Sequence, residues 1–468
     1  MTPSPATVEN LRAPGAIVLV SCYELGHTPH GLAVPRAFLE RAGYRPRSLD
    51  LAIETLDEDS ISRARVVAVS VPMHTALRIG TQVTTRIRRL NPECRVIFHG
   101  LYASLNSRYL LDHGVDYCLG GEIEEPLVAL MEALEAGHDR ASLPGVAHAD
   151  HASGPHLERL DFPVPSRDDG LHGGHARLES DGAQLPAGYT EASRGCRHGC
   201  THCPIPPVYG GRFFVIPADV VIEDIRHQVE AGARHITFGD PDFLNGPRHA
   251  LKVARALHQE FPGLTFDFTA KVEHLIRRQS DLPELADCGA LFVISAVESL
   301  SPSVLEILDK NHTRGDVEKA LSVTRAAGIV MRPTWLPFTP WTTLEDFQEI
   351  LEFVEAEEII ACVDPIQLAI RLLVPPGSWL AEHPSLAPHR GRLNEAAFTY
   401  EWTHPDPAMD RLQKDLLRLV EEDTRNGVDP RETFASMCIH SDRPELAARV
   451  RATTPGPRPP RLTESWFC

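Results

Sequence analysis

Two blocks of this sequence alternate short apolar runs with amphipathic helical stretches, and this alternation restricts the possible folds more than any other feature. In the first block the apolar runs are β-branched and bounded by glycine or polar residues, which is typical of buried strands. Strands that alternate with helices predict a doubly wound parallel sheet. We expect strands at 17–21, 48–51, 66–71, 96–100 and 117–120, and helices at 32–42, 76–90, 105–113 and 126–136.

The second block runs from about residue 189 to residue 371. Ser301 before Pro302 predicts one helix start, and Thr342 with Glu345 predicts a capping box at another. Six β/α units predict an open or partial barrel that binds its ligands at the carboxyl ends of the strands. The expected strands are 189–193, 235–239, 265–270, 291–295, 329–335 and 366–371.

The composition changes between and after these blocks. Residues 145–188 are rich in Gly, Pro, His and Asp, which is typical of a linker. Beyond residue 375 the pattern predicts one amphipathic helix at 409–422 and a proline-rich tail. We therefore expect a sheet domain at 1–145, a linker at 146–188, a barrel at 189–375 and a helical region at 376–468.

Charge and hydropathy exclude several functional classes. The net charge of −18 argues against a general nucleic-acid or anionic-membrane binder. The longest apolar run, residues 16–20, is far shorter than the ~20 residues that cross a bilayer. The first residues lack a signal pattern, so we expect a cytoplasmic protein. In that reducing compartment ten cysteines are too sparse for a disulfide scaffold, and any that cluster are expected to bind metal.

Cys196, Cys200 and Cys203 form the most specific motif, with the spacing Cys-x3-Cys-x2-Cys at the mouth of the second block. Three thiolates within eight residues can hold three corners of a cubane iron–sulfur cluster. The fourth iron is then open to a substrate-like ligand. Zinc is the main alternative, with His198 or His202 as the fourth ligand, although structural zinc sites usually pair two Cys-x-x-Cys knuckles.

This spacing resembles the hallmark of the radical S-adenosylmethionine (SAM) superfamily. In that family the open iron chelates the amino and carboxylate groups of SAM, and electron transfer cleaves a carbon–sulfur bond to give a carbon radical. The string SRGC that ends at Cys196 is similar to the motif of the cobalamin-binding branch. The resemblance implies a flavodoxin-like, Rossmannoid cobalamin-binding domain, a partial (β/α)6 TIM barrel and a small helical extension.

Two further segments resemble this branch at the expected strand ends. Residues 238–243, which include Asp240, are similar to a DD-x-F segment that lies beside the methionine moiety. Residues 294–299 are similar to a G-x-E-S run. The resemblance implies that Asp240, Glu298 and Ser299 bind the cofactor, and a carboxylate such as Glu298 can accept hydrogen bonds from ribose hydroxyls or the ammonium group.

Arg332 and Arg371 each lie on an expected apolar strand. A guanidinium in that position can clamp a carboxylate with two hydrogen bonds, or it can belong to a satisfied ion pair. The sequence leaves both readings open for both residues. We include Arg332 among the candidate cofactor-binding residues.

The first block resembles the cobalamin-binding domain that precedes many radical SAM barrels. The resemblance places His30, Ser70, Gly100 and Gly121 at successive strand ends, where small residues let a flat corrin lie close to the backbone. The D-x-H-x-x-G signature that supplies a histidine to cobalt is absent, because neither His27 nor His30 has an aspartate two residues before it. A vestigial domain without a corrin is the alternative.

The last residues resemble a subgroup of the branch with a Cys-Cys-Ala-Glu-Pro or Cys-selenocysteine-Ala-Glu-Pro tail. The sequence stops at Cys468, the first cysteine of where that tail would be. In this interpretation Cys468 is a catalytic thiol that the proline-rich run 455–460 brings to the barrel mouth. The alternative is a frayed terminal residue.

These features together predict an enzyme with a 4Fe–4S cluster that reductively cleaves SAM and uses the radical on a small molecule, with cobalamin-dependent methyl or alkyl transfer. One alternative is transfer of a 3-amino-3-carboxypropyl group from SAM to a soft thiol or metalloid acceptor. A second is a non-catalytic metal-binding or sensor protein. The expected partners are a small-molecule substrate and an electron donor such as flavodoxin or ferredoxin, with neither nucleic acid nor membrane.

Overall fold

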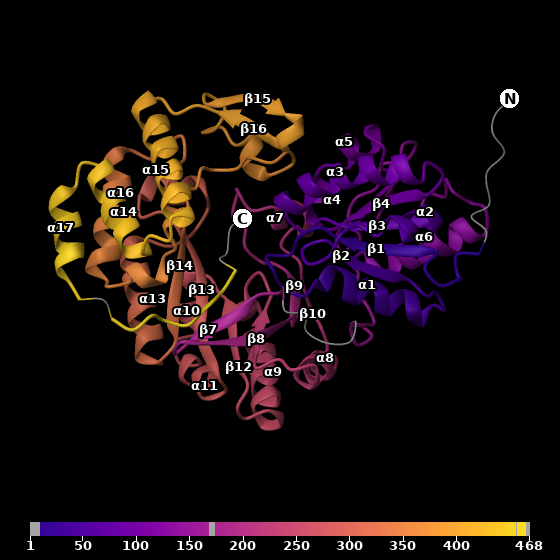
Figure 1. The fold of residues 1–468 in the computed structure, drawn as a ribbon, viewed down its shortest axis with the longest axis horizontal. Coiled ribbons are helices and arrows are strands. Elements are labelled where there is room, and N and C mark those ends of the chain that lie inside the picture. Colours follow the sequence, from indigo (N-terminus) through magenta and orange to yellow (C-terminus); the bar gives the residue numbers. More distant parts are fainter. Residues whose placement is uncertain (1–9, 168–173, 455, 465–468) are drawn as a thin grey trace.

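The computed structural model describes residues 10–167, 174–454 and 456–464 (Figure 1). Two α/β units lie side by side, and three helices near the carboxyl end pack on the outer side of the second unit (Figure 1). Within the described residues, no helix is both long enough and apolar enough to cross a bilayer.

The N-terminal unit is a six-stranded sheet in the order β2-β1-β3-β4-β5-β6. The first five strands are parallel and β6 is antiparallel, so the doubly wound sheet is confirmed with one added edge strand. The bounds of the strands are β1 (Ile17–Ser21), β2 (Arg47–Asp50), β3 (Val66–Ser70), β4 (Arg95–His99), β5 (Tyr117–Leu119) and β6 (Val146–Ala147). The helices are α1 (His30–Arg41), α2 (Glu58–Arg63), α3 (His74–Leu90), α4 (Leu101–Leu105), α5 (Ser107–Asp112) and α6 (Glu124–Glu135).

Every residue of β1 and β3 is buried, as expected for central strands of a sheet covered on both faces. Alternate side chains enter two separate cores because successive residues of a strand point to opposite faces. Val18 and Val67 belong to one core, whereas Ile17 and Val66 belong to the other.

The second unit is a curled sheet in the order β14-β13-β12-β11-β8-β7-β17. Strands β8, β11, β12, β13 and β14 are parallel and form the half-barrel, while β7 and β17 extend it with antiparallel pairs. The strands are β7 (Arg177–Ser180), β8 (Ala183–Thr190), β11 (His235–Phe238), β12 (Thr265–Thr269), β13 (Ala290–Glu298), β14 (Val330–Trp335) and β17 (Arg461–Leu462). The helices are α8 (Ala218–Glu230), α9 (Pro247–Glu260), α10 (Val272–Arg277), α11 (Leu282–Asp287), α12 (Pro302–Ile307), α13 (Arg314–Ala326) and α14 (Leu344–Ala356).

Three predictions for this unit need correction. The sixth strand is wrong, because residues 365–369 form a 3-10 helix that starts at Pro365, which has no N–H for a sheet ladder. The first strand lies earlier than expected, since β8 pairs with β7 in a hairpin inside the predicted linker. The capping box forms one residue later, with Thr343 and Asp346 in place of Thr342 and Glu345.

The carboxyl-terminal region contains more structure than its composition suggests. The expected helix is α15 (Pro407–Arg425), and it is followed by α16 (Pro430–His440) and α17 (Pro444–Ala452). A hairpin of β15 (Arg390–Asn394) and β16 (Thr399–Trp402) precedes them. The proline-rich run then leads back across the half-barrel to β17, which pairs with β7 (Figure 1). We call residues 456–464 the C-terminal strap.

Candidate active site

The three motif cysteines lie in the loop between β9 (Ser193–Gly195) and α7 (Ile205–Tyr209), and β9 pairs with β10 (Phe213–Val215). Gly195 has a positive φ of 76°, and a Cβ there would lie 2.4 Å from the Arg212 carbonyl oxygen, so this turn requires glycine. All three thiols are free, and Cys200 is buried. Burial, together with the neighbouring thiols, raises the pKa of Cys203 to about 12. Such thiols ionise when a metal or cluster binds them.

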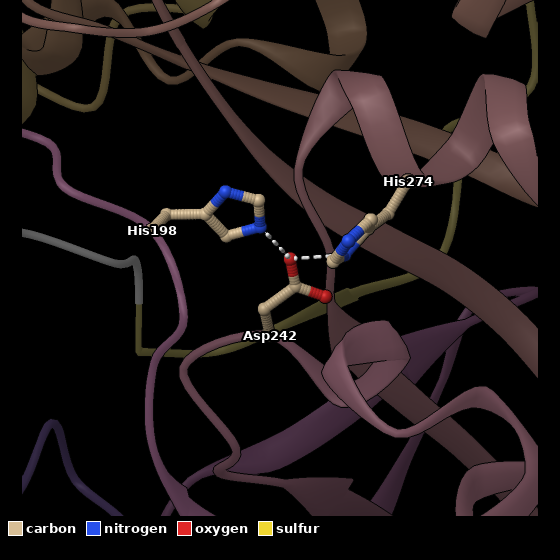
Figure 2. Close-up of side chains that lie close together, drawn as sticks. All are labelled: His198, Asp242 and His274. Atoms are coloured by element: carbon tan, nitrogen blue, oxygen red, sulfur yellow. Dashed lines mark hydrogen bonds and ion pairs between the residues drawn. The ribbon is translucent and has the colours of Figure 1, made fainter. Parts of the chain in front are cut away.

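Carboxylates are the neighbours of both histidines of the zinc alternative. Figure 2 shows that His198 points to Asp242 and His274, and the potential ligand atoms of these three residues all lie within 4.8 Å of one another. His202 instead directs Nε2 to a Glu298 oxygen at 3.3 Å. Neither histidine therefore supports a Cys3His zinc site.

Asp242 lies beside the cysteine loop. Its fully buried carboxylate accepts a hydrogen bond from the Leu244 N–H at 3.0 Å through Oδ1. Its Oδ2 lies 2.7 Å from His274 Nδ1 and 3.7 Å from His198 Nε2 (Figure 2). His198 lies between Cys196 and Cys200, so the middle of the cysteine loop lies beside Asp242, at a distance longer than a hydrogen bond. Sequence reasoning chose Asp240 in this segment, and only the three-dimensional contact identifies Asp242.

Positive charge reaches the loop from Lys310. Its Nζ lies 3.4 Å from Glu298 Oε1, and the ammonium interacts with Cys200 and Cys203, which raises the pKa of the lysine despite its burial. Burial opposes ionisation of Glu298, but Lys310 and His202 outweigh it and lower the carboxyl pKa to about 2. Glu298 is therefore a permanent anion at the end of β13, beside the cluster loop.

Asp240 and Ser299 are both buried and both engaged with neighbouring backbone. Asp240 accepts a hydrogen bond from the Ala192 N–H at 2.8 Å and another from the Ser193 hydroxyl. Burial raises its pKa to about 7. Ser299 Oγ accepts from the Ser301 N–H at 3.1 Å. Contact of either residue with SAM stays a prediction.

Three polar atoms near the carboxyl ends of the half-barrel strands are buried and have no hydrogen-bond partner among the described residues: Asn245 Oδ1, Lys271 Nζ and Ser295 Oγ. Buried polar atoms without partners are costly, so a group of them marks a site completed by a ligand. Asn245 also donates its amide to Cys196 Sγ at 3.6 Å. Neither Asn245 nor Lys271 was predicted, because neither belongs to a motif.

At the carboxyl edge of the N-terminal sheet, Glu24 organises the loop after β1. Its carboxylate accepts from the hydroxyls of Ser21 and Ser70, each at 3.3 Å, and from the Gly31 N–H at 3.2 Å. A Cβ on Gly31 would lie 2.3 Å from Ser70 Oγ, so this close approach requires glycine. Burial raises the pKa of Glu24 to about 7. Ser70 was predicted at this edge, whereas Glu24, the acid that holds it, was not.

The two predicted glycines and two polar atoms complete this edge. Gly100 and Gly121 have φ values of 110° and 76°, and a Cβ on Gly121 would lie 2.1 Å from the His156 carbonyl oxygen. Thr28 Oγ1 and His99 Nε2 are buried without a hydrogen-bond partner among the described residues. Backbone atoms of Val71 and His156 are the nearest neighbours of Gly100 and Gly121, so these glycines let segments of this chain pack closely. The two unpartnered polar atoms are what this edge offers to the amides of a ligand.

His30 faces the half-barrel. Its Nδ1 lies 3.3 Å from an Arg167 nitrogen, and its Nε2 lies 3.5 Å from a Glu191 oxygen. The neighbouring His27 ring packs on Tyr189, with 4.7 Å between ring centroids. His30 is therefore an interface residue, and the geometry gives no support to cobalt ligation by its imidazole.

A buried ion cluster joins the two units next to the cysteines. Arg194, two residues before Cys196, lies 2.7 Å from Glu124 Oε1, 2.9 Å from Glu191 Oε2 and 3.5 Å from Glu122 Oε2. Glu122 follows β5 of the N-terminal sheet and also accepts from the Tyr209 hydroxyl at 2.9 Å. We call Arg194 and these three glutamates the Arg194 cluster. It fastens the start of the cysteine loop to the carboxyl edge of the first sheet.

The two candidate arginines have different surroundings in the structure. Arg371 lies 2.5 Å from Asp410 and 2.5 Å from the Trp402 carbonyl oxygen, and its guanidinium stacks 3.4 Å from the centre of the Trp402 ring. It is a satisfied structural ion pair. Arg332 is 8% exposed, and among the described residues its ion-pair partner is Asp364, at 3.6 Å. Cys468 lies outside the described residues.

Residues 190–354 match the radical SAM superfamily, and residues 16–131 match the B12 binding domain. The hopanoid C-3 methylase of Methylococcus capsulatus is 26% identical over 342 residues, which are 71% of this chain and 65% of that protein. An uncharacterized methyltransferase of Pyrococcus horikoshii is 24% identical over 257 residues, which are 52% of this chain and 54% of that protein. The chain therefore spans less than two thirds of the length of either relative.

Two solved structures share the fold of nearly the whole chain. TsrM from Kitasatospora setae, a radical SAM methyltransferase with cobalamin and a 4Fe–4S cluster bound, has a TM-score of 0.66 at 16% identity and covers 93% of this chain and 99% of its own. OxsB, a cobalamin-dependent SAM radical enzyme with aqua-cobalamin bound, has a TM-score of 0.70 at 14% identity. The match covers 93% of this chain and 72% of OxsB. They confirm the predicted pairing of a B12-binding sheet with a partial barrel.

The two domains imply a 4Fe–4S cluster, SAM and cobalamin, and the residues present fit all three groups. Free thiols of Cys196, Cys200 and Cys203 would provide three cluster ligands. Lys271 Nζ and Ser295 Oγ, which are buried without partners among the described residues, would provide hydrogen-bonding groups for SAM. Thr28 Oγ1 and His99 Nε2 at the edge of the first sheet would do so for the amides of a corrin.

Proposed function

We propose that this chain, which belongs to the branch of the radical SAM superfamily with a B12-binding domain, is a cobalamin-dependent enzyme that methylates a carbon atom of a small molecule. One observation carries the proposal: the Arg194 cluster attaches the start of the cysteine loop to the ligand edge of the B12-binding domain. Carbon methylation needs both cofactors at one substrate, and this attachment supports such an arrangement. The methyltransferase names of two relatives support it as well.

When bound, the cluster supplies the electron that cleaves SAM to a carbon radical, and cobalamin supplies the methyl group. The chain's residues hold and tune these groups. Asp242 lies beside His198 of the cysteine loop, while Lys310 places positive charge beside Cys200 and Cys203. Glu298 is an anionic acceptor for hydroxyls or an ammonium group of SAM.

The substrate side of the proposal comprises a small molecule and an external reductant of the flavodoxin or ferredoxin type. No contact in the described residues favours transfer of a 3-amino-3-carboxypropyl group. Catalytic participation of Cys468 likewise has no described geometry to support it.

The proposal is tested with anaerobically reconstituted protein, SAM, a low-potential reductant and cobalamin. We expect reductive cleavage of SAM to 5′-deoxyadenosine and methionine, and its abolition when Cys196, Cys200 and Cys203 are all replaced by alanine. The matched control replaces Cys362, a half-buried cysteine outside the motif. Cleavage that survives the triple replacement would refute the proposal.

A further inference from the structure

A small cavity of about 30 Å³ lies between the half-barrel and the C-terminal strap. Phe292, Ile294 and Thr334 line it from β13 and β14, and Arg332 and Gln367 provide its polar side. Arg461, Leu462 and Glu464 of the strap, with Asp364, complete the lining. A cavity of this size holds about one water-sized group. It can therefore take the polar head of a ligand and not a whole molecule.

Arg332 is the feature of this cavity that needs a ligand. Its guanidinium has five N–H donors, yet no hydrogen bond reaches it from the described residues. Its Nη1 is buried without any partner, and its Nη2 has only Asp364 at 3.6 Å. The same carboxylate lies 3.5 Å from Arg461, so it is divided between two cations. A buried cation so weakly compensated is costly, which indicates that an anion completes it.

Gln367 is the second polar side chain of this cavity. Its Oε1 is buried and has no partner among the described residues, and the side chain lines the same cavity. An unpartnered acceptor needs a donor, so Gln367 contributes to an anion site only when a half-turn of its amide directs the NH₂ donors into the cavity beside the guanidinium. The planar fork of an arginine matches the two oxygens of a carboxylate. Because Asp364 and Glu464 are also present, one carboxylate is a better match than a doubly charged phosphate.

The position of the cavity indicates which molecule carries that carboxylate. Arg332 is opposite Ile294 in the sheet, and Ile294 is opposite Thr269, the last residue of β12. The cavity is thus level with the end of β12, but it lies before the carboxyl ends of β13 and β14, which continue to Glu298 and Trp335. On its other side, Glu464 accepts from the Tyr23 hydroxyl at 2.8 Å, in the loop after β1 of the B12-binding domain. A ligand held there lies between the half-barrel strands and the strap that contacts the B12-binding domain.

We propose that Arg332 and Gln367 bind the carboxylate of a small, otherwise apolar substrate. The apolar side chains of Phe292, Ile294 and Leu462 would then flank the carbon atom that bears the carboxylate. The assignment of this ligand as the substrate rests on the proposed function, since the methylated molecule has to reach both cofactors. It changes the expectation for Arg332 from a cofactor ligand to a specificity residue.

Formate is the probe, because it is a carboxylate small enough for the cavity. Thermal unfolding of the cofactor-loaded protein is measured in formate and in chloride at equal ionic strength. We expect formate to raise the midpoint of the wild type and to leave that of Arg332→Met unchanged. Arg332→Lys keeps the charge without the fork, so its response to formate should be reduced. The control, Arg371→Met, should keep the full formate response although it is less stable.

A second measurement separates the two sources of a carboxylate. Equilibrium binding of SAM to Arg332→Met should stay within about twofold of the wild type, since a carboxylate clamp is worth about tenfold or more in affinity. If formate raises the unfolding midpoint of Arg332→Met as much as that of the wild type, Arg332 does not bind the carboxylate and the proposed site is wrong. A loss of SAM affinity of about tenfold would show that Arg332 binds SAM and would contradict the assignment of the ligand as substrate. Neither measurement requires turnover, so an inactive protein that keeps the Arg332-dependent formate response would contradict the proposed function alone.

Discussion

At the carboxyl edge of the N-terminal sheet, one carboxylate, Glu24, accepts hydrogen bonds from two serine hydroxyls and a backbone N–H. At the carboxyl edge of the half-barrel, by contrast, buried atoms of Asn245, Lys271 and Ser295 have no partner among the described residues. The first edge is assembled before any ligand arrives, and its glycines provide shape. The second edge keeps donors and acceptors free and provides charge.

This difference matches the chemistry of the two groups. A corrin is broad and flat, and it needs backbone that it can approach closely. SAM carries an ammonium, a carboxylate and a sulfonium, and it needs polar partners that the protein leaves unsatisfied. Thr28 and His99 are unpartnered atoms of the first edge, but burial lowers the pKa of His99 to about 4, so its imidazole is neutral. Variants at the two edges should therefore fail in different ways.

The largest effect is expected from the cysteine loop. Cys203→Ala removes one of three cluster ligands, so the protein should lose most of the roughly four irons expected for a cubane. Cobalamin binding should be unchanged, because the first edge contains no motif cysteine. Iron analysis and the corrin absorbance spectrum measure both quantities, and Cys288→Ala is the control. Loss of both cofactors would show that the two edges are not separately assembled.

The next effect is expected where the two edges meet. Arg194→Met leaves Glu122, Glu124 and Glu191 without their shared cation and should cost about 3–5 kcal/mol of unfolding free energy. Denaturant unfolding measures it. Arg226→Met is the control, because that arginine pairs with Glu260 on the exposed surface and should cost about 1 kcal/mol or less.

A double variant sharpens this prediction. If the cost of Arg194→Met is unpaired buried carboxylates, Glu124→Gln added to it should recover part of the loss. Additive losses would instead assign the effect to packing, including the contact between Arg194 and the Phe162 ring.

A smaller effect tests the shape of the first edge. Gly31→Ala places a Cβ 2.3 Å from Ser70 Oγ and should cost about 1–3 kcal/mol through overpacking. Cobalamin affinity should fall with it. Gly154→Ala, where a Cβ meets nothing within 4 Å, is the control. Adding Ser70→Ala to Gly31→Ala should recover part of the loss, because Glu24 Oε1 still lies 2.6 Å from the new Cβ. No recovery would place the strain at Glu24 and not at Ser70.

The smallest effect is a pH dependence of opposite sign at the two edges. Burial raises the pKa of Glu24 to about 7 in the folded protein, whereas the ordinary value is 4.5. The unfolded chain therefore loses its proton first, and the free energy of unfolding falls as the pH rises from about 4.5 to 7. Glu298, with a pKa of about 2, stabilises the fold above about pH 4.5 and loses this effect as the pH falls towards 2. Thermal midpoints of Glu24→Gln and Glu298→Gln against the wild type measure both. If the effects of the two variants on the thermal midpoint changed with pH in the same direction, the predicted difference between the two edges would be wrong.

The sequence was sufficient for the parallel strands of the first sheet and for finding the cysteine motif. Apolar runs of five residues with β-branched side chains have few alternatives to a buried parallel strand, and β1 has the predicted bounds. The spacing of Cys196, Cys200 and Cys203 is local, so it can be recognised in the sequence without knowledge of the fold. The sixth strand failed because buried residues after Pro365 form a 3-10 helix, and burial alone does not distinguish a strand from a helix.

The remaining site residues depend on contacts that periodicity does not contain. Asp240 and Asp242 are two positions apart in one loop, yet Asp240 braces the backbone before the cysteines and Asp242 meets His274 from α10. Arg332 and Arg371 look alike in sequence and differ only in their partners. The strap pairs Arg461 with Glu179, 282 residues earlier, and no local pattern predicts that contact.

The most direct test of the central claim is the set of products made from SAM by the protein loaded with cluster and cobalamin, in the presence of reductant and its substrate. A carbon methyltransferase of this kind uses one SAM as the source of the radical and another as the source of the methyl group. We therefore expect 5′-deoxyadenosine and S-adenosylhomocysteine in nearly equal amounts, with a substrate that is heavier by one methylene unit. Formation of 5′-methylthioadenosine without S-adenosylhomocysteine would show cleavage of the other carbon–sulfur bond and would contradict the account.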